Sequence, residues 1–227
     1  MLVVLIIPAV SSRSDAAILL ANPADDRAGQ DAAPFDGTFN TLFNFPGLQT
    51  FHFLQVGPPR DENEFRFALE FDIAAIPTGS TITSATLRFT EIRDENGGTV
   101  QLHGYSGDGA VSLADMVVSN VITADISDGS VGVNTIDVTG FIQSLVTGLS
   151  QYAGFMAMTV EASSSGPIYN VQSNEAPTPE NRPLLAVEYS EPLTTEIPEQ
   201  SSLLVWSLIC LGGCLSLIVD AKIRRAS

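Results

Sequence analysis

Few residues of this chain combine a type and a spacing that would support catalysis. The segment from Gly104 to Asp108 begins like the G-x-S-x-G nucleophile elbow of hydrolases, but Asp108 stands where the last glycine is required. The two histidines of the chain, His52 and His103, each lie alone in a strand-like segment. The 26 acidic residues offer many carboxylate pairs, but the sequence assigns none of them the separation that glycoside hydrolysis requires. We therefore predict that the protein is not an enzyme.

Carbohydrate binding requires aromatic faces that stack on sugar rings and polar side chains that bind the hydroxyl groups. The candidate rings are Tyr105, Tyr152 and Tyr169, with His103 as a further candidate. At each position the alternative is a tyrosine at the edge of the core with a hydrogen-bonded hydroxyl. Tyr189 closes the last predicted strand and is expected to fill the core. The single tryptophan, Trp206, lies in the apolar C-terminal segment and is not expected to contribute.

Calcium is the other candidate ligand, because hard cations bind carboxylates and backbone carbonyls that loops supply. Asp108, Asp125 and Asp128 lie in turn-like segments with glycine beside or near them, as does the Asp94-Glu95 pair. None of these segments matches an EF-hand loop, and Asp-Gly is also an ordinary turn pair. We therefore expect at most a structural calcium ion at Asp108, Asp125 and Asp128, and no other cofactor.

The elements that must position these residues are predicted to be strands. The 18 glycines and 13 prolines favour many short strands joined by turns over a helical bundle. Residues 65–72 alternate strictly between apolar and other side chains, which predicts a half-buried strand. Pro77 and Gly79 then predict a turn over residues 73–79. Further strands are predicted at residues 81–92, 99–105, 152–162 and 183–189.

One segment departs from this pattern and predicts a short helix. Residues 137–148 place their apolar side chains at helical spacing. Asp137 or Thr139 is a candidate to cap the start of this helix, and Gly148 its end. We expect the helix to pack over one end of a β-sandwich.

The C-terminal end of the chain predicts a membrane segment. Residues 203–219 form an apolar run without a charge, about 25 Å long as a helix and therefore just able to span a bilayer core. Lys222, Arg224 and Arg225 follow, which predicts that this end faces the cytoplasm. Both cysteines lie within the run, so the part before it has no disulfide. A plain C-terminal anchor is one interpretation.

The N-terminal end indicates export. Residues 2–10 are apolar but too short to span a membrane, and small residues follow around Ala16 and Ala17. This order is similar to the apolar region and cleavage site of a secretory signal peptide, although the usual basic residues at the start are missing.

A formal charge of −16 has the wrong sign for binding a phosphate backbone, so we expect no nucleic-acid partner.

The C-terminal parts also resemble a sorting signal. Pro198 and Glu199, a serine pair, the apolar segment and the final basic cluster are similar to the PEP-CTERM signal of Gram-negative bacteria. The resemblance implies that an exosortase-type enzyme in the membrane recognises the proline-glutamate motif, removes the tail and passes the protein outward. Gln200 stands where that signal usually has a second proline.

Three blocks of the chain resemble the DNRLRE domain family. They are residues 65–89, with a strand ending in Phe-Asp and an Ile-Pro-x-Gly turn, residues 134–148, and residues 173–191 with Asn-Arg-Pro-Leu-Leu-x-Val. The family implies a jelly-roll β-sandwich, which occurs in secreted and surface proteins and in polysaccharide-active assemblies. Some members are regarded as carbohydrate-binding modules.

The predicted fold is therefore all-β: a jelly-roll-like antiparallel β-sandwich with one short helix, plus a C-terminal transmembrane helix. The predicted parts are a signal peptide (1–17), the DNRLRE-like sandwich (30–191), a polar linker with the sorting motif (192–202), the transmembrane helix (203–219) and a basic cytoplasmic tail (220–227).

The expected function is that of an exported surface or extracellular-matrix protein with a structural or adhesive role. Its expected partners are the exosortase-type enzyme, the membrane and an extracellular polysaccharide. The C-terminal helix would anchor it in the inner membrane before sorting to the cell surface or the matrix. The alternatives are a dedicated carbohydrate-binding module and, third, a polysaccharide-degrading enzyme.

Overall fold

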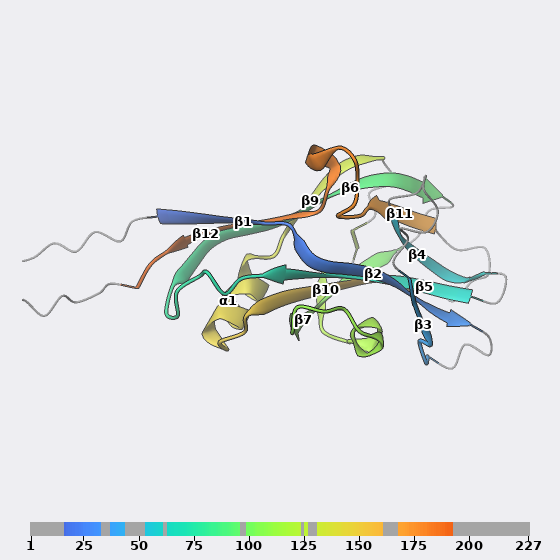
Figure 1. Ribbon diagram of the computed structural model, residues 1–227, viewed down its shortest axis with the longest axis horizontal. Coiled ribbons are helices and arrows are strands. Elements are labelled where there is room, and N and C mark those ends of the chain that lie inside the picture. Colours follow the sequence, from blue (N-terminus) through green and yellow to red (C-terminus); the bar gives the residue numbers. More distant parts are fainter. Residues whose placement is uncertain are drawn as a thin grey trace, which may run out of the picture. The chain divides into compact units, whose positions relative to one another are not determined.

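The computed structural model describes residues 16–32, 37–43, 53–60, 63–95, 99–123, 125–126, 131–160 and 168–192 (Figure 1). All of them belong to one compact unit, Ser14–Pro192. Within these ranges no helix is long and apolar enough to cross a membrane. The predicted transmembrane helix, cytoplasmic tail and sorting residues Pro198, Glu199, Lys222, Arg224 and Arg225 lie outside the described residues, as does most of the predicted signal peptide.

Strands make up most of the described chain. In chain order they are β1 (Ala16–Ala21), β2 (Pro23–Ala32), β3 (Thr41–Phe43), β4 (Phe53–Arg60), β5 (Asn63–Asp72), β6 (Thr81–Glu95), β7 (Val100–Gly107), β8 (Val121–Thr123), β9 (Gly132–Asp137), β10 (Tyr152–Thr159), β11 (Ile168–Gln172) and β12 (Leu184–Ser190). The helical elements are α1 (Thr139–Thr147) and the 3-10 turns η2 (Leu113–Val117) and η3 (Pro179–Asn181).

The strands form two sheets that share β4. In the first sheet β12 and β11 pair with successive parts of β6, β9 pairs with the other edge of β6, and β1 pairs with β12. The second sheet has the order β3-β2-β5-β10-β7-β8. Strand β4 pairs with β11 in one sheet and with β5 in the other. All of these pairs are antiparallel, so the predicted all-β antiparallel fold is confirmed.

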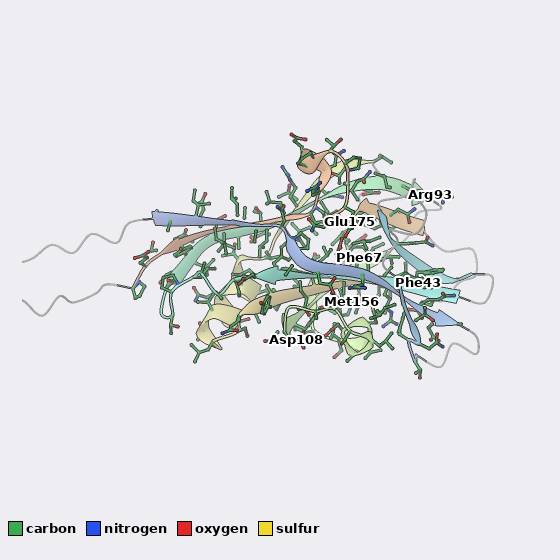
Figure 2. All side chains as sticks on the ribbon, in the orientation of Figure 1. Phe43, Phe67, Arg93, Asp108, Met156 and Glu175 are labelled. Atoms are coloured by element: carbon green, nitrogen blue, oxygen red, sulfur yellow. The ribbon has the colours of Figure 1, made fainter. Side chains whose placement is uncertain are left out.

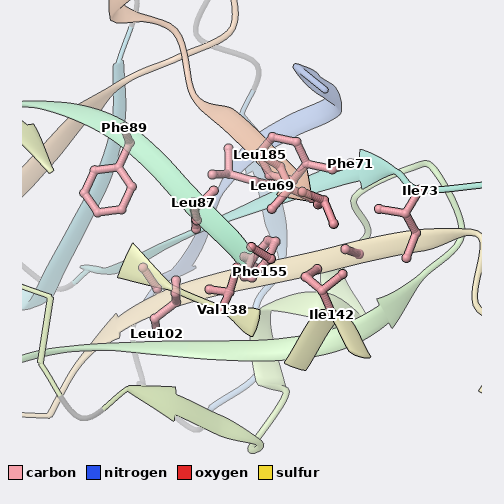
Figure 3. Close-up of a cluster of buried hydrophobic side chains, with 14 of the residues drawn as sticks. Leu69, Phe71, Ile73, Leu87, Phe89, Leu102, Val138, Ile142, Phe155 and Leu185 are labelled. Carbon is pink, nitrogen blue, oxygen red and sulfur yellow. The ribbon is translucent and has the colours of Figure 1, made fainter. Parts of the chain in front are cut away.

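The core lies between the two sheets (Figure 3). Phe67, Leu69 and Phe71 of β5 are buried there, as their alternation predicts. Phe71 meets Phe155 of β10 edge to face, with ring centroids 5.8 Å apart. Full burial of one such side chain contributes about 1.5–3 kcal/mol. Side chains of α1 close one end of this core, which confirms the predicted place of the helix.

The ends of α1 agree with the sequence in part. Asp137 Oδ1 accepts hydrogen bonds from the backbone N–H of Thr139 (2.9 Å) and from its hydroxyl (2.6 Å), but Asp137 lies one residue before the N-cap position, which is Val138 and makes no side-chain cap bond. The helix ends at Gly148, but that residue has a φ of −78°. The left-handed conformation falls on Leu149 instead, with a φ of 64°. Its N–H bonds to the Val146 carbonyl, and the next N–H bonds to Leu145, which completes a Schellman motif.

One boundary and the burial of one strand differ from the prediction. The sandwich begins before residue 30, because β1 pairs with β12 and β2 pairs with β5.

Strand β5 is also not half-buried: on the face away from the core, Ala68 and Glu70 have no exposed surface. The connection between β7 and β8 folds back over that face and covers it. This second layer could not be predicted from the sequence, because a covering loop has no hydrophobic periodicity.

Candidate functional site

The candidate site lies on the face of the second sheet that points away from the core. In the register of β5, β10 and β7, Gly154 pairs with Glu70 on one side and with Tyr105 on the other. Met156 pairs in the same way with Ala68 and His103. Because paired residues point to the same face of a sheet, one row holds the polar groups Glu70 and Tyr105 with a glycine between them.

A second apolar cluster covers part of this face, and it includes Met156 of β10, which Figure 2 labels. Met116 of η2 is fully buried and packs with Ala68, Met156 and Phe39. Arg66 of β5 donates a hydrogen bond to the Met116 carbonyl (2.6 Å) and lies over the Phe39 ring, 4.7 Å from its centroid. These contacts hold the β7–β8 connection against the sheet. The connection therefore covers the sheet next to the row of Glu70 and Tyr105.

Glu70 is held by the start of this connection. Its Oε2 accepts hydrogen bonds from the backbone N–H groups of Asp108 (3.1 Å) and Gly109 (2.5 Å). Burial raises the pKa of the Glu70 carboxyl above its usual value, the Gly109 donor opposes this, and the charges of Asp115 and Asp108 add to the increase. A carboxylate bound by two backbone donors orients the turn that follows β7.

Tyr105 lies beside Glu70, and two glycines make room for the pair. A Cβ on Gly154 would come within 2.4 Å of the Tyr105 ring, and a Cβ on Gly107 within 2.6 Å of the Glu70 carboxylate. Burial, followed by the charge of Glu70, raises the pKa of Tyr105 well above its usual value. The buried Tyr105 hydroxyl lies close enough to the Glu70 carboxylate to lower the pKa of that carboxyl, in opposition to burial.

The structure brings two of the three predicted tyrosines together. Tyr152 pairs with Gly107 in the register of β10 and β7, next to the row of Tyr105, and its ring lies close to Gly109. Both rings are partly exposed. Tyr169 is fully buried in the core, where its ring meets Phe89 edge to face at 6.3 Å. Its ring has no face exposed to a sugar, so the prediction that Tyr169 is a stacking residue is wrong.

The predicted calcium residues do not come together. Asp108 follows the end of β7, and its Oδ1 accepts a hydrogen bond from the N–H of Ala110 (3.1 Å). Asp125 Oδ1 accepts one from the N–H of Val100, at the other end of β7 (3.2 Å). Asp128 lies outside the described residues. In the described part of the chain, no group of three or more His, Cys, Asp or Glu side chains is arranged to hold a metal ion, and Asp108 and Asp125 lie at opposite ends of β7.

The partial nucleophile elbow does not assemble either. His103 and Ser106 are three residues apart in β7 and therefore point to opposite faces of the sheet. The Ser106 hydroxyl lies 2.8 Å from that of Ser150. His103 is buried opposite Met156, and burial followed by the charge of Arg66 lowers its pKa. A buried imidazole on the wrong face cannot accept the serine proton.

Sequence reasoning also missed a pocket next to α1, at one end of the sandwich. It is formed by the turn after β5 and by the segment that follows α1. Its lining comes from two parts of the chain with no motif in either. Residues 73–78 and 146–151 lie side by side because β5 pairs with β10, which places Asp72 opposite Tyr152. The sequence alone does not show this pairing.

The sequence matches no protein-family model and no curated protein. The two family resemblances therefore remain predictions from the quoted residues.

Proposed function

We propose that this chain is an exported β-sandwich module that is sorted to the cell surface or the extracellular matrix and has a structural or adhesive role there. One observation carries the proposal. Strand β1 pairs with β12 from Ala16↔Ser190 onward, so the sandwich begins and ends at the same end (Figure 1). The faces and the opposite end, where Ala32, Arg60 and Asn63 meet, are left for contacts with other molecules.

This arrangement suits a tethered module. A signal peptide cleaved near Ala17 would release the chain at the first residues of β1. The polar linker with Pro198 and Glu199 would leave β12 at the same end and lead to the membrane helix at residues 203–219. The resemblance to the PEP-CTERM signal supports processing by an exosortase-type enzyme. The resemblance to the DNRLRE family supports a jelly-roll topology for the sandwich.

The geometry of the candidate groups supports a structural or adhesive role over catalysis. Ser106 and His103 lie on opposite faces of β7, and Oε2 of Glu70 binds two backbone donors. The Glu70 carboxylate fixes the start of the β7–β8 connection. Polysaccharide is the proposed partner, and no metal or other cofactor is invoked.

The second candidate is a dedicated carbohydrate-binding module. The observation that favours it is the gathering of Tyr105, Tyr152 and Asp108 on one side of the second sheet. Two rings with a neighbouring carboxylate are the groups that sugar binding requires.

The test is sorting in a Gram-negative host that has an exosortase-type enzyme, with the chain behind a functional signal peptide. We expect the intact chain to lose its tail and appear in the surface and matrix fractions. A Pro198→Ala/Glu199→Ala variant should stay in the inner membrane at full length, whereas Thr194→Ala/Thr195→Ala, in the same linker, should be sorted normally. Equal sorting of all three chains would overturn the proposal. Retention of washed polysaccharide by the sorted chain, lost in Tyr105→Ala/Tyr152→Ala, would favour the second candidate.

A further inference from the structure

The pocket beside α1 has the size and lining of a small ligand site. Its volume is about 300 Å³, at the lower end of the range for such sites. It is lined by Ile73, Ala74, Ile76, Thr78, Val146, Leu149, Ser150 and Gln151. None of these side chains carries a charge, although the chain as a whole has a formal charge of −16. The lining therefore selects a neutral ligand.

The pocket has an aliphatic floor and a polar rim. Ile73, Ile76 and Val146 are buried, whereas Thr78 and Gln151 are exposed and Ser150 is partly exposed. Backbone hydrogen bonds fix the two walls: the Ile73 N–H bonds to the Gln151 carbonyl (2.9 Å), and the Ile76 N–H bonds to the Ile73 carbonyl (3.0 Å). The site is therefore already formed in the free protein.

Leu149 contributes an exposed apolar side chain to the pocket. Among the described residues it is the one non-glycine residue with a positive φ, 64°, which costs free energy for a side chain with a Cβ. It is the C′ residue of the Schellman motif, whose hydrogen bonds favour this conformation, and it is 67% exposed. The same side chain lines the pocket. Contact with an apolar group of a bound ligand would give Leu149 the burial that it lacks.

We propose that this pocket binds a neutral sugar residue that carries an acetamido group. The acetyl methyl would pack on Ile73, Val146 and Leu149. The hydroxyls of Thr78 and Ser150 and the amide of Gln151 would bond to the polar groups of the sugar. No aromatic ring lines the pocket, so recognition would depend on the methyl group and not on stacking. This inference rests on the proposed polysaccharide partner and names its class.

The test is binding of chitotriose, the trimer of N-acetylglucosamine, to the full chain in detergent, with cellotriose as the matched sugar that lacks acetamido groups. Calorimetry gives the affinities, and saturation-transfer NMR shows which ligand protons contact the protein. We expect chitotriose to bind about tenfold more tightly than cellotriose, with the strongest transfer at the acetyl methyl. Leu149→Gly and Gln151→Ala should each weaken binding about fivefold. Val133→Ala removes exposed aliphatic surface outside the pocket and should leave binding unchanged.

Absence of chitotriose binding, equal affinity for the two sugars, or full affinity in Leu149→Gly would each overturn the inference. Sorting and polysaccharide retention are measured separately, so the two failures can be told apart. A chain that is sorted and retains polysaccharide but ignores chitotriose would refute the pocket assignment alone. A chain that binds chitotriose but is not sorted would refute the proposed function alone.

Discussion

The ring of Tyr105 lies against the backbone of Gly154, its partner in the register of β7 and β10. Because glycine has no side chain there, the tyrosine can reach across β10 toward Glu70 on the next strand. The carboxylate of Glu70 in turn binds the N–H groups that begin the covering connection. The absence of a side chain at Gly154 therefore lets Tyr105 approach Glu70, the residue that binds the covering connection.

Gly154→Ala should destabilise the protein by about 1–3 kcal/mol, the usual cost of overpacking. The added Cβ would lie within 2.4 Å of the Tyr105 ring, and the ring would have to move away from Glu70. The measurement is the urea midpoint of unfolding. Gly140→Ala in α1 is the matched control, since a Cβ there meets nothing within 4 Å and should stabilise the helix by up to about 1 kcal/mol. A Tyr105→Ala background should remove most of the penalty at Gly154; an unchanged penalty would show that the ring is not its cause.

Calcium removal should leave the melting temperature unchanged. Asp108 and Asp125 lie at opposite ends of β7 and each accepts a backbone hydrogen bond, so they cannot share an ion. The measurement is a thermal melt with a chelator and with added calcium. A rise of the melting temperature on adding calcium that Asp108→Asn abolishes would contradict this expectation.

Leu149→Gly should stabilise the protein by about 0.5–1 kcal/mol, because glycine adopts the left-handed conformation without the steric cost of a Cβ. Little burial is lost, since the leucine side chain is mostly exposed. The same change should weaken sugar binding at the pocket, so stability and binding would move in opposite directions. The check is a denaturant melt of Leu149→Gly beside Leu149→Ala, which keeps the strained backbone and should show no gain.

The sequence was informative where a single physical pattern decides the structure. The alternation of β5 correctly predicted Phe67, Leu69 and Phe71 in the core, and the spacing over residues 137–148 predicted α1. Strand β2 was missed because its sequence, PADDRAGQDA, is polar and yet pairs along most of β5. Tyr169 and Tyr152 look alike in sequence, but the strand partners of each decide which ring is buried. The pocket was missed because its two walls meet only through the pairing of β5 with β10.

Asp26 should make stability fall as the pH rises from about 4 to about 7. This carboxyl is 3% exposed, and burial raises its pKa from 3.8 to about 7, although its Oδ2 accepts a hydrogen bond from the Asn174 N–H (2.7 Å). Glu175 and Asp25 raise the pKa further, and Arg27 opposes them. Between the two pKa values the folded state binds more protons than the unfolded chain, so its stability decreases with pH.

Asp26→Asn should remove much of that slope, because the neutral amide cannot lose a proton and its oxygen can still accept the Asn174 N–H. We expect the variant to melt at a higher temperature than the natural chain at pH 8 and at nearly the same temperature at pH 4. The measurement is a series of thermal melts across this range. Asp72→Asn, at an exposed carboxyl that accepts the Ala74 N–H (2.9 Å), is the matched control and should leave the slope unchanged. If Asp26→Asn melts below the natural chain at pH 8, the carboxylate form stabilises the fold and the assigned direction of the pKa shift is wrong.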